Sequence, residues 1–411
     1  MLPYPITRAE ISRSRLTGNF QYLRSLFSDT TQETRGEKHS CEHYELLVVV
    51  KANAYGNGIS LCAPWLLEAG AQWLGVTSAE EGVAARQLCT DAHILVMRGL
   101  LAGEAEAVMD ARLVPTVWDR THLNLLANAA RQRTLASGSV PLHVEIDTGM
   151  SRQGVGLAAL PKFLDALRKI PALHVSGVST HFASAEMLDA EQNRQQRSAF
   201  QRALEQIFAA GFRPQWIHAG SSSTILAQQY EALCGLAKTW GARFLLRPGI
   251  ALYGYAPAFS GANIETAEQA RSGLQPVLSW KTAIASTQTV EAGIAIGYDA
   301  TFVAPASMRL ALLPVGYADG LNRKLSGSNA SPGGHVLIHG VAAPIVGRVS
   351  MDLTVVDVSH IPNAATGDEI VILGEQNGQR VTADDHARWA GTIPYEILCA
   401  INTRVPRIAC K

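Results

Sequence analysis

Short apolar runs alternate with amphipathic segments along the first 250 residues of this 411-residue chain. Each run is rich in Val, Ile, Leu or Trp, and each is short enough to be a strand buried on both faces of a parallel sheet. The pattern predicts eight strands, at Leu46–Lys51, Gln72–Thr77, His93–Arg98, Val114–Asp119, Leu142–Asp147, His174–His181, Gln215–Ala219 and Phe244–Arg247.

The segments between these runs carry helix signals. Ser78, with Glu81 three residues later, forms a capping-box pattern at the start of Ala79–Leu88. Apolar residues recur at spacings of three and four over Phe200–Phe208, and Gly211 is a natural helix stop. Eight strands separated by helices predict an α/β fold, a (β/α)8 TIM barrel. A doubly wound open sheet is the competing fold, but no GxGxxG turn follows the first strand.

The pattern changes after Tyr255. The stretch 256–276 is polar, weakly periodic and interrupted by Gly and Pro, as expected of a linker. Shorter strands separated by turn glycines then predict a compact β domain. We therefore expect a barrel domain over 1–257 and a mainly β C-terminal domain over 258–411. The elements expected there are strands at Val277–Thr287, Arg309–Pro314, His335–His339, Ala343–Val346, Leu353–Val358 and Glu369–Leu373, and helices after Thr382 and at Pro394.

Composition and charge narrow the class of function. Hydrophobic residues make up 47% of the chain and charged residues 17%, as in a globular protein with a large core. The 35 Lys and Arg residues balance the 35 Asp and Glu residues. The chain therefore has no net positive charge to attract nucleic acid or an anionic membrane, and we expect neither as a partner. Chemistry on a small-molecule substrate is the better expectation.

The lack of a recognisable targeting signal and the scattered cysteines predict a cytoplasmic protein. The first residues lack the apolar core of a signal peptide, and no apolar stretch reaches 18 residues. The cysteines show no CxxC pair or other metal-like spacing, so we expect free thiols and no metal site, although a single disulfide stays open. They are Cys41, Cys62, Cys89, Cys234, Cys399 and Cys410.

Candidate chemistry gathers at the strand ends, where barrels carry their catalytic residues. The first strand ends at Lys51, and a partly desolvated lysine is nucleophilic enough to form a Schiff base. Taken alone, the strand favours the simpler interpretation, in which Lys51 ends the strand and reaches into solvent. The loops after strands seven and eight commonly hold a phosphate, and Ser222 with the amides of Gly249 and Ile250 fits that role. A lysine and a phosphate seat together point to pyridoxal phosphate.

Eight motifs follow one another across both expected domains: VVVKANAYGNG, EIDTGMSRQGV, STHFASAE, RPGIALYGY, IGYDATF, LLPVGYADGL, GRVSMDLTVVDV and TIPYEI. In this order they resemble the motifs of alanine racemases, and the resemblance extends from Arg8 to Arg407. It implies an enzyme that uses pyridoxal phosphate to interconvert L-alanine and D-alanine, with D-alanine supplied for peptidoglycan. It also implies a homodimer with shared active sites.

The resemblance implies roles for individual residues. Lys51 would carry the cofactor and act as the base on one face of the substrate. Tyr298 of the second subunit would be the base on the other face, because racemisation needs bases on both sides of a planar carbanion. Arg247 would bond the pyridine nitrogen and, having no lone pair, keep it unprotonated. The resemblance places His181 near the cofactor ring, Arg152 near the phenolic oxygen and the substrate carboxylate, Tyr55, Ser222, Gly249, Ile250 and Tyr395 around the phosphate, and Tyr317, Met351 and Asp352 of the partner at the substrate mouth.

The chain departs from the family pattern at Glu145, where many members carry a carbamylated lysine. A glutamate is already anionic, so we expect Glu145 to hold Arg152 by charge-assisted hydrogen bonds. The rival interpretation is a strand residue that faces solvent. A serine in His218–Ser222, where the family usually has asparagine, and Phe302 leave open a broader amino-acid racemase. A non-catalytic binding protein for pyridoxal phosphate is the less favoured alternative, since it would lack the β domain and Tyr298.

Overall fold

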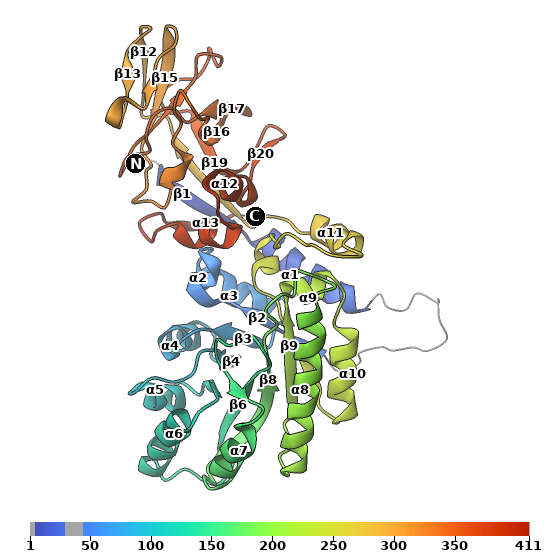
Figure 1. Ribbon diagram of the computed structural model, residues 1–411. Coiled ribbons are helices and arrows are strands. Elements are labelled where there is room, and N and C mark those ends of the chain that lie inside the picture. Colours follow the sequence, from blue (N-terminus) through green and yellow to red (C-terminus); the bar gives the residue numbers. More distant parts are fainter. Residues whose placement is uncertain (1–4, 29–43, 411) are drawn as a thin grey trace. The chain divides into compact units, whose positions relative to one another are not determined.

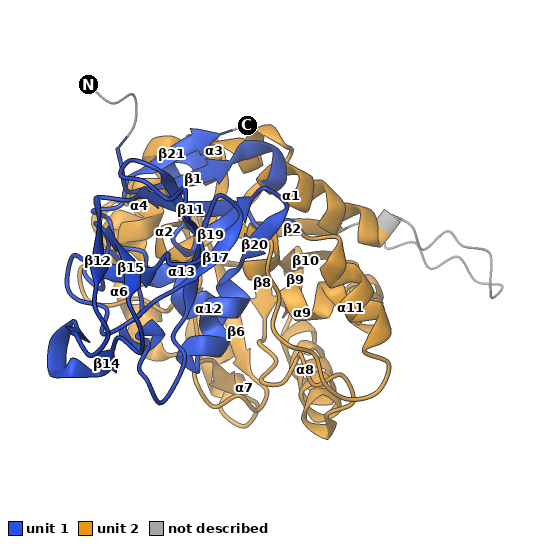
Figure 2. Ribbon diagram, turned by 90° about the horizontal axis from the view of Figure 1, so that it is seen from above, with its two compact units in different colours: residues 1–15, 55–61, 275–411 blue, residues 16–54, 62–274 orange. Residues whose placement is uncertain are grey.

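The computed structural model describes residues 5–28 and 44–410 (Figure 1). The chain forms two compact units, coloured separately in Figure 2. The barrel unit comprises residues 16–54 and 62–274, and the β unit comprises residues 1–15, 55–61 and 275–411.

The barrel unit is built on a closed sheet of parallel strands. Each strand pairs with the next along the chain, and β10 pairs with β2 to close the ring. The predicted eight-stranded TIM barrel is therefore confirmed. The strands are β2 (Tyr44–Val49), β3 (Trp73–Val76), β4 (His93–Val96), β5 (Val114–Val117), β6 (Val140–Asp147), β8 (Leu173–Ser179), β9 (Trp216–Ser221) and β10 (Arg243–Arg247), with the short β7 (Val155–Gly156) beside β6.

Helices cover the outside of this ring (Figure 1). α4 (Ala79–Leu88) has the predicted bounds, and α8 (Glu191–Ala209) contains the predicted apolar repeat, whose residues are buried. Gly211 follows α8 with a φ of 89°, the left-handed conformation of a helix stop. The other helices are α1 (Arg13–Ser28), α2 (Lys51–Tyr55), α3 (Ile59–Glu68), α5 (Glu104–Asp110), α6 (Arg120–Gln132), α7 (Leu160–Arg168), α9 (Ser222–Leu226), α10 (Glu231–Thr239) and the 3-10 helix η1 (Ile250–Tyr253).

The stretch expected to be a linker contains a helix, α11 (Glu265–Ser272). Its buried residues are Ala267 and Ala270, which contribute little to a hydrophobic pattern because alanine is small. The hydroxyl of Tyr22 donates a hydrogen bond of 3.0 Å to the carbonyl of Ala270. The expectation of an irregular linker is therefore wrong over these residues, since tertiary contacts select the helix.

The β unit contains the N-terminal strand as well as the C-terminal part of the chain. β1 (Arg8–Ser12) pairs antiparallel with β11 (Leu278–Ala283) and parallel with β21 (Arg407–Cys410). The predicted strand Val277–Thr287 is two strands, β11 and β12 (Ser286–Val290), which belong to different sheets. The main sheet continues through β19 (Glu369–Gln376), β16 (His335–Ile338) and β17 (Val341–Pro344), with β20 (Gln379–Val381) beside β19; β12, β15 (Met308–Leu313) and β18 (Thr354–Asp357) form a second sheet.

Both helices predicted near the C-terminus are present. Thr382 caps α12 (Ala383–Ala390): its side chain accepts a hydrogen bond from the amide of Asp385. Pro394 opens α13 (Pro394–Ala400) at its first position. Two further 3-10 helices are η2 (Tyr298–Ala300) and η3 (Arg323–Leu325).

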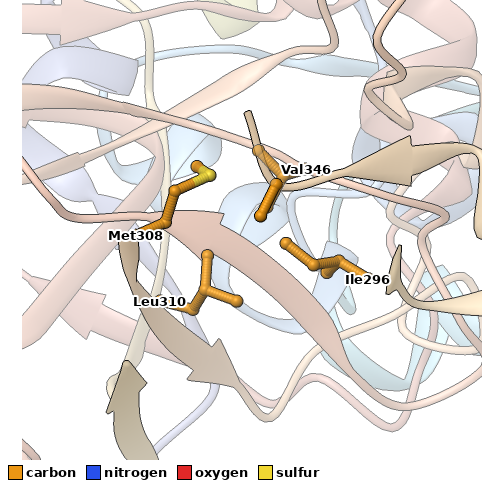
Figure 3. Packing of buried hydrophobic residues seen from close by; sticks show 5 residues of the cluster. Ile296, Met308, Leu310 and Val346 are labelled. Carbon is orange, nitrogen blue, oxygen red and sulfur yellow. The ribbon is translucent and has the colours of Figure 1, made fainter. Parts of the chain in front are cut away.

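A buried apolar cluster, shown in Figure 3, includes Ile296 of the hairpin formed by β13 (Ala295–Ile296) and β14 (Phe302–Val303), and Phe302 packs against it. Ile296 comes from the hairpin itself, so the cluster anchors the base of the loop that carries η2. Its other buried members are Ala304, Met308, Leu310 and Val346.

The cysteines only partly follow the expectation of free thiols. Cys62, Cys89, Cys399 and Cys410 are not in disulfides, but Cys234 is disulfide-bonded. Cys41 lies outside the described residues. Among the described residues, no group of three or more His, Cys, Asp or Glu side chains is arranged to hold a metal ion. No helix within these residues is long and apolar enough to cross a membrane.

Candidate active site

The C-terminal ends of the barrel strands carry the candidate residues, as expected. Lys51 follows β2 by two residues, and His181 follows β8 by two residues. Arg247 is the last residue of β10, and Ser222 begins α9 directly after β9. Arg152 lies in the loop after β6. Closure of the barrel therefore brings these side chains to one rim of the barrel unit.

The backbone after Lys51 makes a left-handed turn. Ala52, Asn53, Ala54 and Tyr55 have φ values of 51°, 53°, 56° and 53°. Residues other than glycine pay about 1–2 kcal/mol each for this conformation. The amide of Ala54 donates a hydrogen bond of 2.8 Å to the carbonyl of Val50, which closes the turn around Lys51. Such strain persists only where surrounding contacts hold it.

Arg247 is the buried cation of the site, with only 8% of its surface exposed. One terminal nitrogen donates to His218 Nδ1 at 2.8 Å and to the carbonyl of His218 at 3.2 Å. The other donates to the carbonyl of Thr180 at 2.7 Å and lies 3.3 Å from His181 Nδ1. Burial lowers the pKa of Arg247, and the charge of Glu145 opposes this shift. Among the described residues no acceptor engages Nε–H, the fifth donor.

Two histidines extend this network into the barrel. Because Arg247 donates to Nδ1 of His218, that ring carries its proton on Nε2, from which it donates to His143 Nδ1 at 2.8 Å. Burial lowers the pKa of His218 well below its usual value and that of His143 to about 3, and the charge of Arg247 adds to both shifts. Both rings are therefore neutral. The tautomers follow from the arginine, which has no lone pair.

His143 packs tightly and has one unsatisfied atom. Its Nε2 has no hydrogen-bond partner among the described residues. A Cβ added at Gly177 on β8 would lie 2.5 Å from this atom, so only glycine leaves room for the ring. His143 was not predicted from the sequence as a site residue. The available signal was a histidine between Leu142 and Val144 within an apolar strand.

The pKa of His181 is shifted by three charged side chains of the barrel unit. Burial and, after it, the charges of Arg247, Arg152 and Lys51 together lower its pKa to about 3. The ring is therefore neutral and lies within the field of three cationic side chains. These four residues, each predicted from sequence, belong to one electrostatic cluster.

The residues predicted to bind a phosphate lie after the seventh and eighth barrel strands, at the start of α9 and of η1. Ser222 is 3% exposed, and its Oγ accepts hydrogen bonds from the amides of Gly249 at 3.0 Å and Ala251 at 3.2 Å. Because two amides occupy the oxygen, the hydroxyl proton is available to an anion. Ile250, at 1% exposure, begins η1 between them.

Glu145 is buried, with 6% of its surface exposed. The interpretation of a solvent-facing strand residue is therefore wrong. The hydroxyl of Ser179 donates to Glu145 Oε2. Burial raises the pKa of Glu145, while the charges of Arg247 and Arg152 and the bond from Ser179 lower it.

The candidate residues of the β unit fall into three groups, of which Tyr298 alone is the third. Tyr55 and Tyr395 have ring centroids 6.1 Å apart, and burial raises the pKa of Tyr55, so its hydroxyl stays protonated. Tyr317 lies beside the segment of Met351, because its amide donates to the carbonyl of Ser350 at 2.9 Å. In the same region Arg404 bridges Asp319 and Asp352 at 3.0 and 2.9 Å.

Tyr298 stands at the tip of the β13–β14 hairpin, with 67% of its surface exposed. The backbone beside it is left-handed, with φ values of 77° at Gly297 and 59° at Asp299. The carboxylate of Asp299 lies 2.8 Å from Nε of Arg348. The hairpin therefore presents the phenol outward on a constrained turn.

Comparison with known proteins identifies the family. The family model of the alanine racemase N-terminal domain matches residues 33–257, and that of the C-terminal domain matches residues 277–409. The alanine racemase of Halothermothrix orenii is 35% identical over 402 residues, covering 98% of this chain and 96% of that protein. That of Geobacter sulfurreducens is 35% identical and covers 88% and 90%.

Solved structures agree with these matches. The alanine racemase from Streptomyces lavendulae, a D-cycloserine producer, has a TM-score of 0.84 at 30% identity and covers 99% of this chain and 98% of its own. That of Bartonella henselae, with covalently bound pyridoxal phosphate, has a TM-score of 0.78 at 25% identity and covers 99% and 100%. The two-part architecture and its strand-end site thus define an enzyme of the isomerase class. The chain belongs to the alanine racemase family.

The buried histidines predict a pH dependence of stability. Their folded-state pKa values lie below the unfolded value of about 6.5, so the free energy of unfolding is highest above that pH and falls as the pH drops toward 3. His143→Asn should reduce this slope by up to about 1.4 kcal/mol per pH unit, because one proton fewer binds on unfolding. Urea unfolding between pH 4 and about 7 measures it.

The matched control is His174→Asn, the same change at an exposed position of β8. An unchanged slope for His143→Asn would show that His143 is not neutral in the folded protein.

Proposed function

We propose that this protein racemises alanine with pyridoxal phosphate as its cofactor, by two bases on opposite faces of the substrate. One observation carries the proposal. Arg247 is buried with four of its donors engaged by the barrel, and its Nε–H is left for a ligand atom that accepts a hydrogen bond. A pyridine nitrogen is such an atom, and Lys51 follows the neighbouring strand β2.

The residues present fit the cofactor in three respects. Lys51 lies at a strand end of the barrel that also holds Ser222, whose hydroxyl proton is available to a phosphate oxygen. The amide of Ile250 belongs to the same loop and we assign it to the phosphate, whereas the amide of Gly249 donates to Ser222 Oγ and holds that side chain. His181 is neutral and can pack against a ring. We assign Tyr55 and Tyr395 to the phosphate as further hydroxyl donors. When bound, pyridoxal phosphate supplies an electron sink for a carbanion at the substrate Cα.

The network behind Arg247 tunes this sink. A guanidinium stays protonated, so it donates to the pyridine nitrogen and does not transfer a proton to it. The nitrogen then withdraws fewer electrons, which limits side reactions such as transamination. His218 and His143 keep the guanidinium in place, because both are neutral and oriented by hydrogen bonds.

Two side chains move the protons in this proposal. Lys51 removes or returns a proton at Cα through its amine, and Tyr298 of the partner subunit does so on the opposite face through its phenol oxygen. Tyr298, Tyr317 and Met351 are 67%, 44% and 54% exposed in the single chain, so their side chains are accessible to a second subunit. These exposures support a homodimer in which the partner's Tyr317, Met351 and Asp352 line the substrate mouth.

Arg152 binds the substrate carboxylate in this proposal, and Glu145 steadies it through charge. A carboxylate at this position carries its negative charge without carbamylation. The product D-alanine would supply peptidoglycan synthesis. Broader use of amino acids such as serine or lysine is the second candidate for the substrate, favoured by the departures in His218–Ser222 and at Phe302.

The direct test is to load the purified protein with pyridoxal phosphate and incubate it separately with L-alanine, L-serine and L-lysine. We expect D-alanine to form fastest, as measured by chiral chromatography of the products. Lys51→Ala should abolish turnover, since it removes both the attachment point and one base. Cofactor binding without D-alanine would overturn the substrate assignment.

A mixed dimer tests the shared site. Lys51→Ala and Tyr298→Phe chains, each inactive alone, are mixed under conditions that exchange subunits. One site of each mixed dimer then has both bases, so we expect activity to recover to about a quarter of the wild-type value per chain after random pairing. Mixing Lys51→Ala with itself is the control. Recovery that does not exceed this control contradicts the cross-subunit assignment of Tyr298.

Glu145→Gln tests the charge beside Arg152. We expect kcat/KM for alanine to fall about 10- to 100-fold, because the amide keeps the shape but loses the charge that steadies the arginine. The thermal midpoint should change little. Asp165→Asn, the same change at an exposed position of α7, is the matched control. Full activity of Glu145→Gln would disprove this role.

A further inference from the structure

The carboxylate of Glu81 contacts the turn that follows Lys51. The sequence pattern predicts Glu81 only as part of a capping box with Ser78, and half of that box is present: the amide of Glu81 donates to Ser78 Oγ at 3.2 Å. The carboxylate itself is used elsewhere. Its Oε1 accepts the amide of Ala52 at 2.8 Å, and its Oε2 accepts the amide of Thr77 at 2.7 Å. Glu81 thus links α4 to the residue directly after Lys51.

This contact continues the β2–β3 pairing beyond its last rung. The amide of Val50 donates to the carbonyl of Gly75 at 2.9 Å, which is the last backbone bond from this strand to β3. The amide of Ala52, two residues later, donates to the side chain of Glu81 on α4, the helix that follows β3. The backbone of Lys51 is therefore held on both sides, by a strand bond before it and a carboxylate after it.

The conformation held in this way is an unfavourable one. Ala52 is the first of four successive residues other than glycine with left-handed φ values. Local propensity opposes this turn, so contacts from outside must stabilise it. A carboxylate that accepts from a backbone amide is a strong acceptor, and here each oxygen accepts from a different amide.

We propose that Glu81 is a positioning residue for Lys51: its carboxylate holds the left-handed turn and thereby sets the direction from which the lysine amine reaches the substrate. The inference rests on the proposed function, because it takes the role of Lys51 from there. Glu81 touches neither substrate nor cofactor in this assignment. Its effect is transmitted through the amide of Ala52.

Glu81→Gln tests the inference. The glutamine oxygen accepts from one amide, but its NH2 group faces the other amide with a donor, so one of the two bonds is lost. We expect kcat for alanine to fall about 10- to 100-fold with KM nearly unchanged, as for a displaced reacting group. Glu80→Gln is the matched control, since it removes the same charge from an exposed position of the same helix turn.

Hydrogen exchange of the protein without cofactor supplies a readout independent of activity. In Glu81→Gln the amides of Ala52 and Ala54 should exchange at least about 10-fold faster, while those of α4 after its first turn stay protected. If Glu81 only caps the helix, the reverse is expected: the amides of α4 exchange faster, and the exchange rates of Ala52 and Ala54 do not change. That result would overturn the inference.

A rescue experiment separates strain from general damage. Ala52 is exposed, so Ala52→Gly removes no buried contact and allows the left-handed conformation without a Cβ clash. In the Glu81→Gln background, Ala52→Gly should restore kcat at least about threefold. If Ala52→Gly does not restore kcat in this background, the inference is contradicted. It is also contradicted if Glu81→Gln alone has the kcat and the exchange rates of the wild type. If wild type and Glu80→Gln both fail to racemise alanine, the proposed function fails instead, and the exchange data still decide whether Glu81 holds the turn.

Discussion

The buried guanidinium of Arg247 is the interaction on which the barrel's site depends. Removing a cation from water costs several kcal/mol unless acceptors replace the lost solvent. The barrel supplies them from β9 and from the end of β8, through His218 and the carbonyl of Thr180. This demand fixes the tautomer of His218 and, through it, that of His143. Neutral histidines around a permanent cation are the consequence.

Two strained turns carry the two proposed bases. Lys51 opens a left-handed turn of residues other than glycine, and Tyr298 stands between Gly297 and Asp299, both with positive φ. In each case contacts from outside the turn stabilise its unfavourable φ values. At the first turn the contact is the carboxylate of Glu81 from α4. At the second turn the contacts are the apolar cluster that includes Ile296 and the ion pair of Asp299. Strain at reacting groups fixes their direction at the expense of stability.

Most of the fold was predictable because it rests on local patterns. The eight barrel strands and α4 were found within a few residues, since buried strands need short apolar runs and helices need their caps. α11 was missed because its buried face consists of alanines. The pairing of β1 with β11 and β21 was also invisible, because partners more than 250 residues apart leave no local signal. The disulfide of Cys234 had no distinguishing spacing.

The sequence by itself determined which groups stand at the strand ends, because a strand's length and the residue that follows it are local properties. The positions of Lys51, His181 and Arg247 at strand ends were predictable from these local properties. The tertiary structure alone decided their partners. Burial of Glu145, the tautomer chain from Arg247 and the contact of Glu81 with the turn arise only when the sheet closes, since closure brings residues from separate strands within hydrogen-bond distance and excludes water from around them.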